Sequence, residues 1–334
     1  MNTVRLVIPD LFLPKDFAAE VGAGLSLPAL EKMLGRGNSE TPEPADLENL
    51  LCELFGVPCQ ADAPIATFSA AFDGLTAGCW LRADPVHLNL QRNQLLLAGV
   101  QVSSGEAEEF CASLNGYFAG QGMEFFAPHP QRWYVRVDAM PRIRTRPLSQ
   151  VMGGDVRGAL PSGEDAQRWH RVLNEIQMLL FAHPLNAARD ARGTLAINSV
   201  WLWGGGCGEN VTLKKNYDIV SSDEVLAEML AAASGVSFAE WTGQWRDAEG
   251  RQLLVWTGLR SGLQNGDLAD WRSALQHFES GYARPLWQAL RSGTIARLQI
   301  DLLSGNNIRR VLLTRGDTWA FWRRIKRLSE YSLV

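Results

Sequence analysis

The feature that most constrains the fold is the alternation of short apolar strands with amphipathic helices at both ends of the chain. At the start, a strand over 4–10 is followed by helices over 27–34 and 46–55, while residues 64–72 fit either state. After residue 196, the expected strands are 197–203, 217–220, 253–257, 295–302 and 310–314, and the expected helices are 221–233, 267–291 and 318–328. Such alternation favours an α/β fold, in which helices cover both faces of a mostly parallel sheet.

The middle of the chain has a different pattern. Two strands, a helix and two further strands follow one another, and the helix begins with a capping box at Ser103 and Glu106. The strands are 80–88, 94–102, 123–126 and 133–137, the helix is 103–118, and a second helix follows over 165–183. We therefore expect an α/β core of residues 1–75 and 195–334, interrupted by a smaller α+β unit with its following helix at 76–194.

The composition is that of an ordinary globular chain. Of the 334 residues, 46% are hydrophobic and 20% are charged, and the formal net charge of −4 gives no bulk attraction to nucleic acid. The longest apolar runs, such as 95–100, are far too short to span a membrane. The chain opens with a strand and not with a basic region before an apolar signal core, so we expect a cytoplasmic protein.

The cysteines give no sign of a metal site or a covalent framework. They are odd in number, scattered and without a C-x-x-C pair, which argues against a zinc knuckle and against disulfides. They are Cys52, Cys59, Cys79, Cys111 and Cys207. We expect them to be small buried hydrophobic residues.

A tryptophan and glycine stretch is the first candidate for a ligand site. Trp201 and Trp203 lie on one face of an expected strand, which then runs into glycines that let a ligand or another backbone come close. The glycines concerned are Gly204, Gly205 and Gly206. Asn174, on the helix before this strand, could add a polar contact. The alternative is a tight strand exit beneath two core tryptophans. The spacing matches neither a Walker loop nor a dinucleotide-binding motif.

Arg82 and His87 are the second candidate. They lie beside an expected strand of the inserted unit, and a guanidinium with an imidazole could bind an anion such as a phosphorylated metabolite. The alternative is that Arg82 is an ordinary exposed strand residue.

Four stretches together resemble the cofactor-independent phosphoglycerate mutases of the archaeal type, within the alkaline-phosphatase superfamily. They are Leu6-Val-Ile-Pro-Asp10, 27–37, 46–58 and the Trp-Leu-Trp-Gly stretch within 198–206. Taken as a whole, the sequence is more similar still to a bacterial family usually labelled as regulatory proteins. The resemblance implies an alkaline-phosphatase-like fold. It also implies two divalent metals, Mn or Zn, held by Asp and His ligands, and a Ser that takes the phosphoryl group.

The sequence departs from that pattern at the metal and serine positions. Asp10 is in register with the first metal ligand, but Ala45 stands where the family has its serine. The loop 258–267 contains no histidine, and Asp301 is followed by Leu302 where the family has Asp-His. Leu, Gly and Ala cannot replace such ligands. We therefore expect no catalytic residue and no metal cofactor, with Asp10 and Asp301 as vestiges of the metal site or as strand-end and capping residues.

These observations favour a non-catalytic, mutase-like protein that acts as a regulator or a ligand sensor. Its partner would be an unidentified protein or a phosphorylated small molecule. The first alternative is an active metal-dependent mutase or phosphatase that uses two divalent metals. The second is a protein-interaction scaffold, because ten of the twelve tryptophans lie beyond residue 168.

The expected C-terminal helix, 318–328, carries Trp319, Trp322 and Ile325 on one side, with basic residues around it. A docked helix with a solvated basic face is the main interpretation, and contact with an anionic surface is the alternative.

Overall fold

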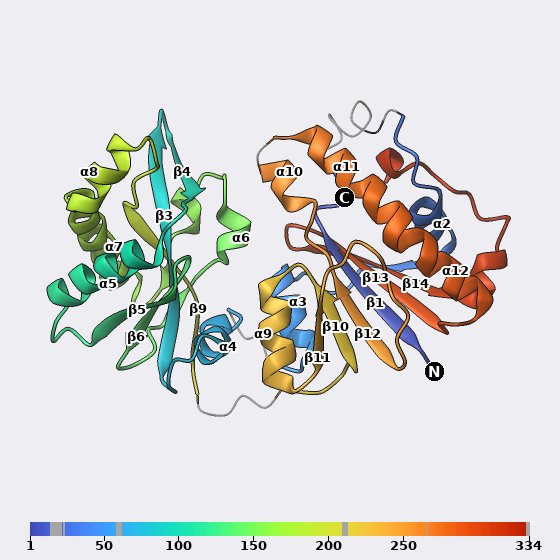
Figure 1. Ribbon diagram of the computed structural model, residues 1–334, viewed down its shortest axis with the longest axis horizontal. Helices are drawn as coiled ribbons and strands as arrows, with labels where there is room; N and C mark the ends of the chain where they lie inside the picture. Colours follow the sequence, from blue (N-terminus) through green and yellow to red (C-terminus); the bar gives the residue numbers. More distant parts are fainter. Residues whose placement is uncertain (14–21, 23, 58–61, 209–212, 265, 332–334) are drawn as a thin grey trace. The chain divides into compact units, whose positions relative to one another are not determined.

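The computed structural model describes residues 1–334 except 14–21, 23, 58–61, 209–212, 265 and 332–334 (Figure 1). The chain forms two compact units. Unit 1 comprises residues 1–56 and 213–334, and unit 2 comprises residues 57–212. None of the helices within the described ranges is long and apolar enough to cross a membrane.

Unit 1 is built on a seven-stranded sheet in the order β11-β10-β12-β1-β13-β14-β2. The first five strands in this order run parallel, and β14 and β2 are antiparallel to their neighbours. The strands are β1 (Thr3–Pro9), β2 (Asn38–Glu40), β10 (Ile219–Ser222), β11 (Ser237–Glu240), β12 (Arg251–Val255), β13 (Arg297–Ser304) and β14 (Asn307–Thr314). The expected α/β class with a mostly parallel sheet is confirmed.

Both faces of this sheet are buried, as parallel strands require. Leu6, Leu254 and Ile300 are part of one hydrophobic core with side chains of α2, α11 and α12. On the opposite face, Val7 and Val255 are fully buried as well. The helices are α2 (Pro28–Arg36), α3 (Leu47–Leu54), α9 (Val225–Ser234), α10 (Arg260–Gln264), α11 (Leu268–Phe278) and α12 (Arg284–Ser292), with a π-helical turn η2 (Glu279–Ala283) and 3₁₀ turns η3 (Arg315–Trp319) and η4 (Leu328–Glu330).

Pro285 does not interrupt the long helix that the sequence predicts over 267–291. α11, η2 and α12 follow one another as one continuous rod (Figure 1), and Pro285 occupies the first turn of α12. The chain takes up the missing N–H and the bulk of the ring through the π-helical turn directly before it. Proline within a helix usually breaks or kinks it, but here its effect is a local widening of the helix.

Unit 2 is an antiparallel α+β unit. Its sheet has the order β4-β3-β6-β5, and β9 pairs with β3 as a fifth strand. The strands are β3 (Cys79–Gln91), β4 (Gln94–Gly99), β5 (Met123–His129), β6 (Arg132–Val137) and β9 (Ser199–Cys207), with a separate pair β7 (Ile143–Arg144) and β8 (Ser162–Gly163). The helices are α4 (Ile65–Phe72), α5 (Ser104–Tyr117), α6 (Leu148–Val151), α7 (Ala166–Phe181) and α8 (Pro184–Ala191), and η1 (Arg157–Ala159) is a 3₁₀ turn.

The borders of unit 2 differ from the expected insertion at 76–194. α4 and β9 belong to unit 2, although the sequence analysis assigns both to the α/β core. The reason is pairing: β9 runs antiparallel to β3 through 79–86, so it extends the smaller sheet. The glycines at 204–206 also lie within β9 and not in a loop after it.

The C-terminal segment is not the predicted helix. η3 ends at Trp319, and the chain is irregular until η4 begins at Leu328. Hydrogen bonds to distant groups replace the helical ones: the Arg36 guanidinium donates to the Thr318 carbonyl at 2.6 Å, and the Leu328 amide donates to Glu31 Oε1 at 3.0 Å. Trp319 was expected on the docked, apolar side of that helix, but its side chain is exposed.

The prediction that the cysteines form no disulfide is wrong for two of them. Cys79 and Cys207 are direct partners in the β3–β9 register and form a disulfide. Pairing brings together residues that are 128 positions apart, which no spacing rule reveals. Cys52 and Cys111 are buried as predicted, and burial raises the pKa of the Cys111 thiol to about 12. The prediction for Cys59 lies outside the described residues.

Candidate functional site

The carboxyl edge of the parallel sheet in unit 1 is where an α/β fold places ligands. β1, β10 and β12 are adjacent and parallel, so the residues that follow them meet at the same edge. Four polar side chains gather there: Asp10 after β1, Asp223 and Glu224 after β10, and Arg260 after β12. We call them the edge cluster.

Asp10 takes an unusual backbone conformation at this edge. Its φ angle is +62°, a left-handed value that few residues other than glycine adopt. The Asp10 amide donates to the Leu303 carbonyl at 3.0 Å, which fixes the turn that follows β1. Asp tolerates this conformation better than most residues, and strain of this kind is concentrated at functional sites.

Arg260 is the only cation of the edge cluster. Its Nε lies 3.4 Å from Asp10 Oδ2, and its Nη1 lies 3.5 Å from Glu224 Oε2. The guanidinium is therefore shared between two carboxylates from two different strands. These distances are long for ion pairs, and all three side chains keep partial access to solvent. Arg260 acts as an internal counter-ion for the edge.

Asp223 is the third acid of the cluster, and the residue as a whole is exposed although its carboxyl is partly covered. Its Oδ1 accepts hydrogen bonds from the Thr257 amide at 2.7 Å and from the Thr257 hydroxyl at 3.2 Å. Burial raises the pKa of this carboxyl, and the hydrogen bonds from Thr257 only partly oppose that rise. Thr257 thereby links the ends of β10 and β12.

The residues of the edge do not fit a two-metal site. Such a site needs Asp and His ligands around two cations, and the only histidine within residues 1–56 and 213–334 is His277, on α11. Within the part of the chain that the structure describes, no group of three or more His, Cys, Asp or Glu side chains could hold a metal ion. Arg260, moreover, places a positive charge between two of the carboxylates. The expectation that the chain uses no metal stays a prediction.

Asp301, the other residue that the sequence singles out, is not at this edge. It lies opposite Val7 in the β1–β13 register, three residues before the position of Asp10. Its fully buried carboxylate accepts hydrogen bonds from Arg5 Nε at 2.6 Å and Arg310 Nε at 2.7 Å. The structure thus separates Asp301 from Asp10 and makes it a buried counter-charge within the sheet.

In unit 2, Arg82 and Trp203 come together in a buried polar network. Arg82 donates to Asp84 Oδ1 at 2.6 Å and to the Ser69 hydroxyl at 2.9 Å, and its guanidinium lies 5.3 Å from the centre of the Trp203 ring. Trp203 Nε1 donates to Asp84 Oδ2 at 2.7 Å. Tyr134 joins the network through Ser69, and burial raises the pKa of its hydroxyl. Protein groups therefore satisfy Arg82 without a ligand, and its role in anion binding stays a prediction.

The glycines of β9 allow close packing against the protein itself. Gly204 has a φ of +65°, and a Cβ on Gly206 would lie 2.5 Å from Thr67 Oγ1 and 2.7 Å from Pro64 Cβ, beside α4. A Cβ on Gly205 would lie 2.9 Å from the Met140 sulfur. These contacts account for the glycines by packing, and a ligand role for them stays a prediction.

The remaining candidates make contacts of their own. Trp201 lies opposite Asp84 in the β3–β9 register and is buried, and its Nε1 donates to the Arg146 carbonyl at 2.8 Å. His87 contacts the Ala196 carbonyl through Nδ1 at 2.8 Å. Asn174 lies on the exposed side of α7. The structure thus brings Arg82 and Trp203 together, with Trp201 next to them on β9, and none of the contacts described for the network involves His87 or Asn174.

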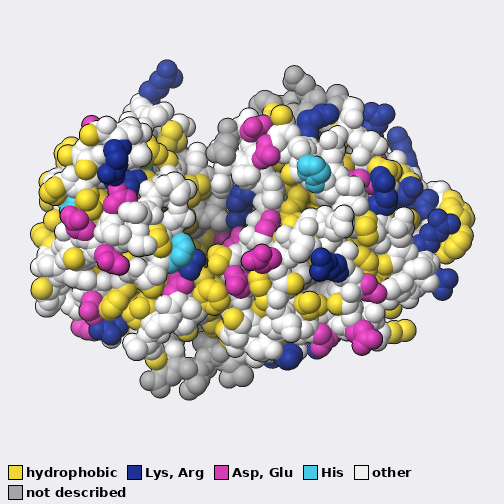
Figure 2. All heavy atoms as spheres, in the orientation of Figure 1, with side chains coloured by type: hydrophobic (Ala, Val, Ile, Leu, Met, Phe, Trp, Pro, Cys, Tyr) yellow, Lys and Arg dark blue, Asp and Glu magenta, His cyan; other side chains and the backbone are white. Residues whose placement is uncertain are grey.

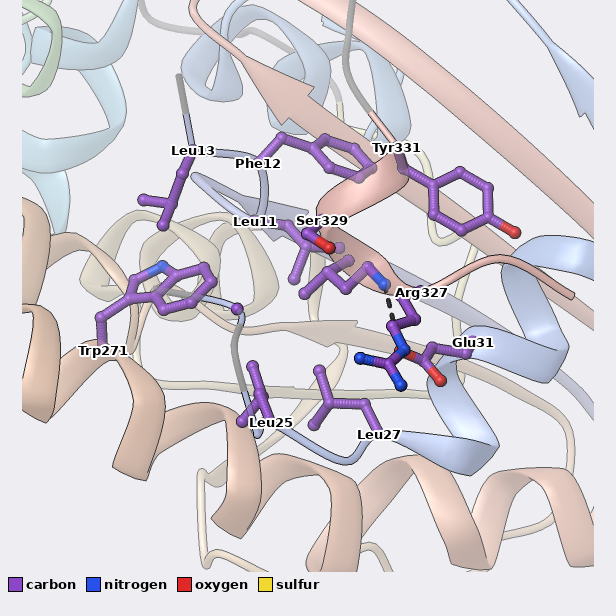
Figure 3. A pocket seen from close by; sticks show the side chains of 12 residues that line it. Leu11, Phe12, Leu13, Leu25, Leu27, Glu31, Trp271, Arg327, Ser329 and Tyr331 are labelled. Carbon is purple, nitrogen blue, oxygen red and sulfur yellow. Dashed lines mark hydrogen bonds between the residues drawn. The ribbon is translucent and has the colours of Figure 1, made fainter. Parts of the chain in front are cut away.

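A small apolar cavity lies elsewhere in unit 1 (Figure 3). Leu11, Leu27 and Trp271 line it together with Leu328, whose amide donates to Glu31. Its volume is about 20 Å³, which holds about one water molecule and no metabolite. The edge cluster is therefore the better candidate site.

Comparison with curated sequences finds partial similarity to one kind of enzyme. A probable 2,3-bisphosphoglycerate-independent phosphoglycerate mutase of Geobacter sulfurreducens is 26% identical over 176 residues, which is 49% of this chain and 43% of that protein. The chain is similar to cofactor-independent phosphoglycerate mutases. A 2,3-bisphosphoglycerate-independent phosphoglycerate mutase of Methanothrix thermoacetophila is 35% identical over 60 residues, 18% of this chain and 15% of that protein. The matches thus span less than half the length of these relatives.

One solved structure supports the fold of this chain. The PH0037 protein from Pyrococcus horikoshii matches with a TM-score of 0.58 and 13% identity, over 98% of this chain and 91% of that one. A cofactor-independent phosphoglycerate mutase from Thermoplasma acidophilum matches with a TM-score of 0.49 and 14% identity, over 98% and 93%. No family model matches the sequence.

Sequence reasoning found one residue of the edge cluster and missed the other three. Asp10 is conspicuous as an acid that ends a strand. Arg260 lies in the loop 258–267, which is notable in the sequence only for its lack of histidine. The pair Asp223 and Glu224 directly follows the observed β10, which ends at Ser222, whereas the expected strand ended at residue 220 and the expected helix 221–233 included both acids. Glu224 is instead the N-cap of α9, accepting from the Leu226 amide at 3.3 Å.

Proposed function

We propose that the protein is a non-catalytic relative of the phosphoglycerate mutases and acts by binding, as a regulator or a ligand sensor. The observation that carries the proposal is Arg260, which lies between the carboxylates of Asp10 and Glu224 at the carboxyl edge of the sheet. The resemblance implies two divalent metals at this place. The Arg260 guanidinium at this edge and the lack of histidine ligands support a function that does not use these metals.

Charge explains why this arrangement is poor for phosphoryl transfer. The transfer needs concentrated positive charge on the oxygens of the moving group, which two metal ions supply. Arg260 carries one positive charge and already faces two carboxylates. The edge cluster therefore offers little excess positive charge to a phosphoryl group.

Metal binding to the purified protein tests the proposal. After incubation with Mn²⁺ or Zn²⁺ and desalting, we expect well below one metal per chain by mass spectrometry. We also expect no interconversion of 2- and 3-phosphoglycerate by ³¹P NMR, with the Geobacter sulfurreducens relative as the positive control. Stoichiometric metal and turnover that Asp10→Ala abolishes would overturn the proposal.

An Arg260→Ala variant makes the test sharper. If Arg260 is the internal counter-ion, its removal leaves the carboxylates uncompensated. Mn²⁺ affinity, measured by calorimetry, should then rise by about tenfold or more, which corresponds to about 1.4 kcal/mol. Arg251→Ala removes an exposed arginine that pairs with Asp218 away from the edge and should leave Mn²⁺ affinity unchanged.

An active metal-dependent mutase is the second candidate, and the similarity to proteins described as mutases favours it. The enzyme would act on a phosphorylated three-carbon acid, whereas the sensor would bind an unidentified protein or a phosphorylated small molecule, for which such acids are the first probes. Tryptophan fluorescence and thermal unfolding in the presence of such acids measure binding independently of turnover. Binding without turnover fits the sensor, and turnover fits the enzyme.

A further inference from the structure

We propose that the aromatic–basic segment, residues 319–327 of unit 1, attaches the protein to the surface of an anionic lipid membrane. The inference is independent of the edge cluster and of any metal.

The segment exposes an unusual amount of apolar surface. Trp322 is 81% exposed, Phe321 68% and Trp319 47%, and Ile325 is exposed as well. In Figure 2, hydrophobic and basic side chains gather at the edge of the view where the C-terminal segment lies in Figure 1. Contiguous exposed apolar side chains mark interaction surfaces, whereas single ones are ordinary.

Positive charge is interleaved with these side chains. Arg323, Arg324, Lys326 and Arg327 belong to the segment, and residues 318–329 contain no acid, although the whole chain has a net charge of −4. Asp317, just before this range, pairs with Arg323 at 3.6 Å, so the positive charge of the segment rests on the other three side chains. The segment is therefore a basic patch on an acidic protein, and its charge complements an anionic surface.

Two further arginines support the aromatic rings from neighbouring elements. Arg36 of α2 lies 5.6 Å from the centre of the Phe321 ring, and Arg291 of α12 lies 5.2 Å from that of Trp319. Cations above aromatic faces place positive charge where the rings would meet lipid headgroups.

The segment is held in place although it is not helical. Arg323 donates to the Arg36 carbonyl and, at 2.9 Å, to Asn38 Oδ1. Its two ends are fixed by the hydrogen bonds that Thr318 and Leu328 make with α2. A surface that is already ordered loses less conformational entropy on binding.

A bilayer fits this surface better than a folded acidic protein does. Tryptophan and phenylalanine insert at the boundary between headgroups and acyl chains, while arginine and lysine stay at the anionic headgroups. A stable protein interface buries about 800 Å² on each partner and needs a complementary shape, which a nine-residue irregular segment does not provide. Lipid requires no such shape.

Vesicle binding by the full chain tests the inference. Co-sedimentation with vesicles of about 30% phosphatidylserine in phosphatidylcholine should exceed that with pure phosphatidylcholine by about tenfold and should be lost at about 0.5 M salt. Tryptophan emission should shift to shorter wavelength on binding. Equal binding to both vesicles, or to neither, would overturn the inference.

Paired variants locate the surface. Trp322→Ala and the double change Arg324→Glu with Lys326→Glu should each reduce binding by about tenfold or more. Phe181→Ala on α7 removes an equally exposed aromatic ring, 82% exposed, and should not change it. Equal losses in Trp322→Ala and Phe181→Ala, or capture of the chain by poly-glutamate beads but not by vesicles, would contradict a lipid partner. Circular dichroism of each variant confirms that it is folded.

Discussion

Two carboxylates with buried side chains are held by partners from other elements. Asp301 is held between Arg5 and Arg310, and Asp73 in unit 2 is held by Arg132 and Tyr134. A buried charge without its partner is costly, whereas a satisfied one mainly fixes the arrangement of its neighbours. These acids are therefore the positions where single substitutions should be most informative.

Asp301→Ala should lower the free energy of unfolding by about 3 kcal/mol, because it leaves two arginines without the carboxylate between them. The measurement is urea denaturation followed by circular dichroism. Glu164→Ala, which removes an exposed ion pair with Arg142, is the control and should cost less than about 1 kcal/mol. Equal losses would show that the buried pairs contribute no more than surface ones.

Asp73 makes the stability of unit 2 depend on pH. Burial raises the pKa of this carboxyl, but hydrogen bonds from Arg132 and Tyr134 outweigh burial, and the net shift is downward. A lowered pKa in the folded state gives stability above the usual Asp value of about 3.8, and this stability is lost as the pH falls through the folded value.

Asp73→Asn should therefore be less stable than the wild type at about pH 6, and the gap should narrow towards about pH 3. Urea titrations at several pH values measure the gap. Asp190→Asn, an exposed substitution on α8, controls for the change in net charge. A gap that stays constant with pH would contradict the linkage.

Prediction from sequence succeeds at single residues only where the signal is local. Asp10 is recognisable because it ends a strand, and the Ser103 and Glu106 capping box is confirmed because both halves lie within one turn. Arg260 could not be identified, because its partners Asp10 and Glu224 lie 250 and 36 positions away. Only the parallel sheet brings them together.

At the scale of elements, α2 depends on a cap from another helix. Leu27 at its N-terminus has no side chain that can accept a hydrogen bond, and the buried carboxylate of Glu279 accepts from the Ala29 amide at 2.8 Å and the Leu30 amide at 3.1 Å. Glu279 lies in the π-helical turn. Burial raises the pKa of this carboxyl, and the two amides counteract the rise.

Glu279→Ala should lower the free energy of unfolding by about 1–2 kcal/mol, since it leaves two buried amides without acceptors. Glu279→Gln, which keeps one carbonyl oxygen, should lose less. Hydrogen exchange at Ala29 and Leu30 should quicken in both variants. Glu108→Ala, at an exposed position of α5, is the control, and an equal effect there would refute the cap.

The elements that the sequence predicts well are those with a strong period or cap, such as β1, α5 and α7. The C-terminal helix fails because helical spacing in 318–328 competes with two other hydrogen bonds, which Arg36 donates to Thr318 and Glu31 accepts from Leu328. Spacing describes only contacts within the segment, and these two residues belong to α2. β9 was predicted as a strand, but its partner β3 could not be identified from local pattern.

At the scale of the whole molecule, the alternation of strands and helices was sufficient to predict the parallel sheet, and its interruption was sufficient to predict an insertion. The borders of the insertion were not predictable, because they depend on the pairing of β9 with β3. The same pairing creates the Cys79–Cys207 disulfide. The disulfide connects two strands within unit 2, so its effect should be confined to that unit.

Cys79→Ser with Cys207→Ser should destabilise unit 2 by up to about 5 kcal/mol in the chain-entropy model, given the sequence separation of 128. Hydrogen exchange should quicken in β3 and β9 but not in β1, β12 or β13. Dithiothreitol should produce the same change in the wild type and none in the double variant. Equal quickening in both units would show that they unfold together. Non-reducing peptide mapping verifies the bond.

The place where the chain leaves unit 1 and returns to it is closed by a backbone hydrogen bond. The Lys214 amide donates to the Phe55 carbonyl at 2.7 Å, and the Asn216 side chain donates to the Leu54 carbonyl at 2.8 Å. Residues 57–212 are thus an insertion in the chain of unit 1, and hydrogen bonds join the two points where this insertion begins and ends. The entropy of closing a loop grows only with the logarithm of its length. A change in the length of the inserted unit should therefore cost the sheet little free energy, and the strands that form the edge cluster should keep their register.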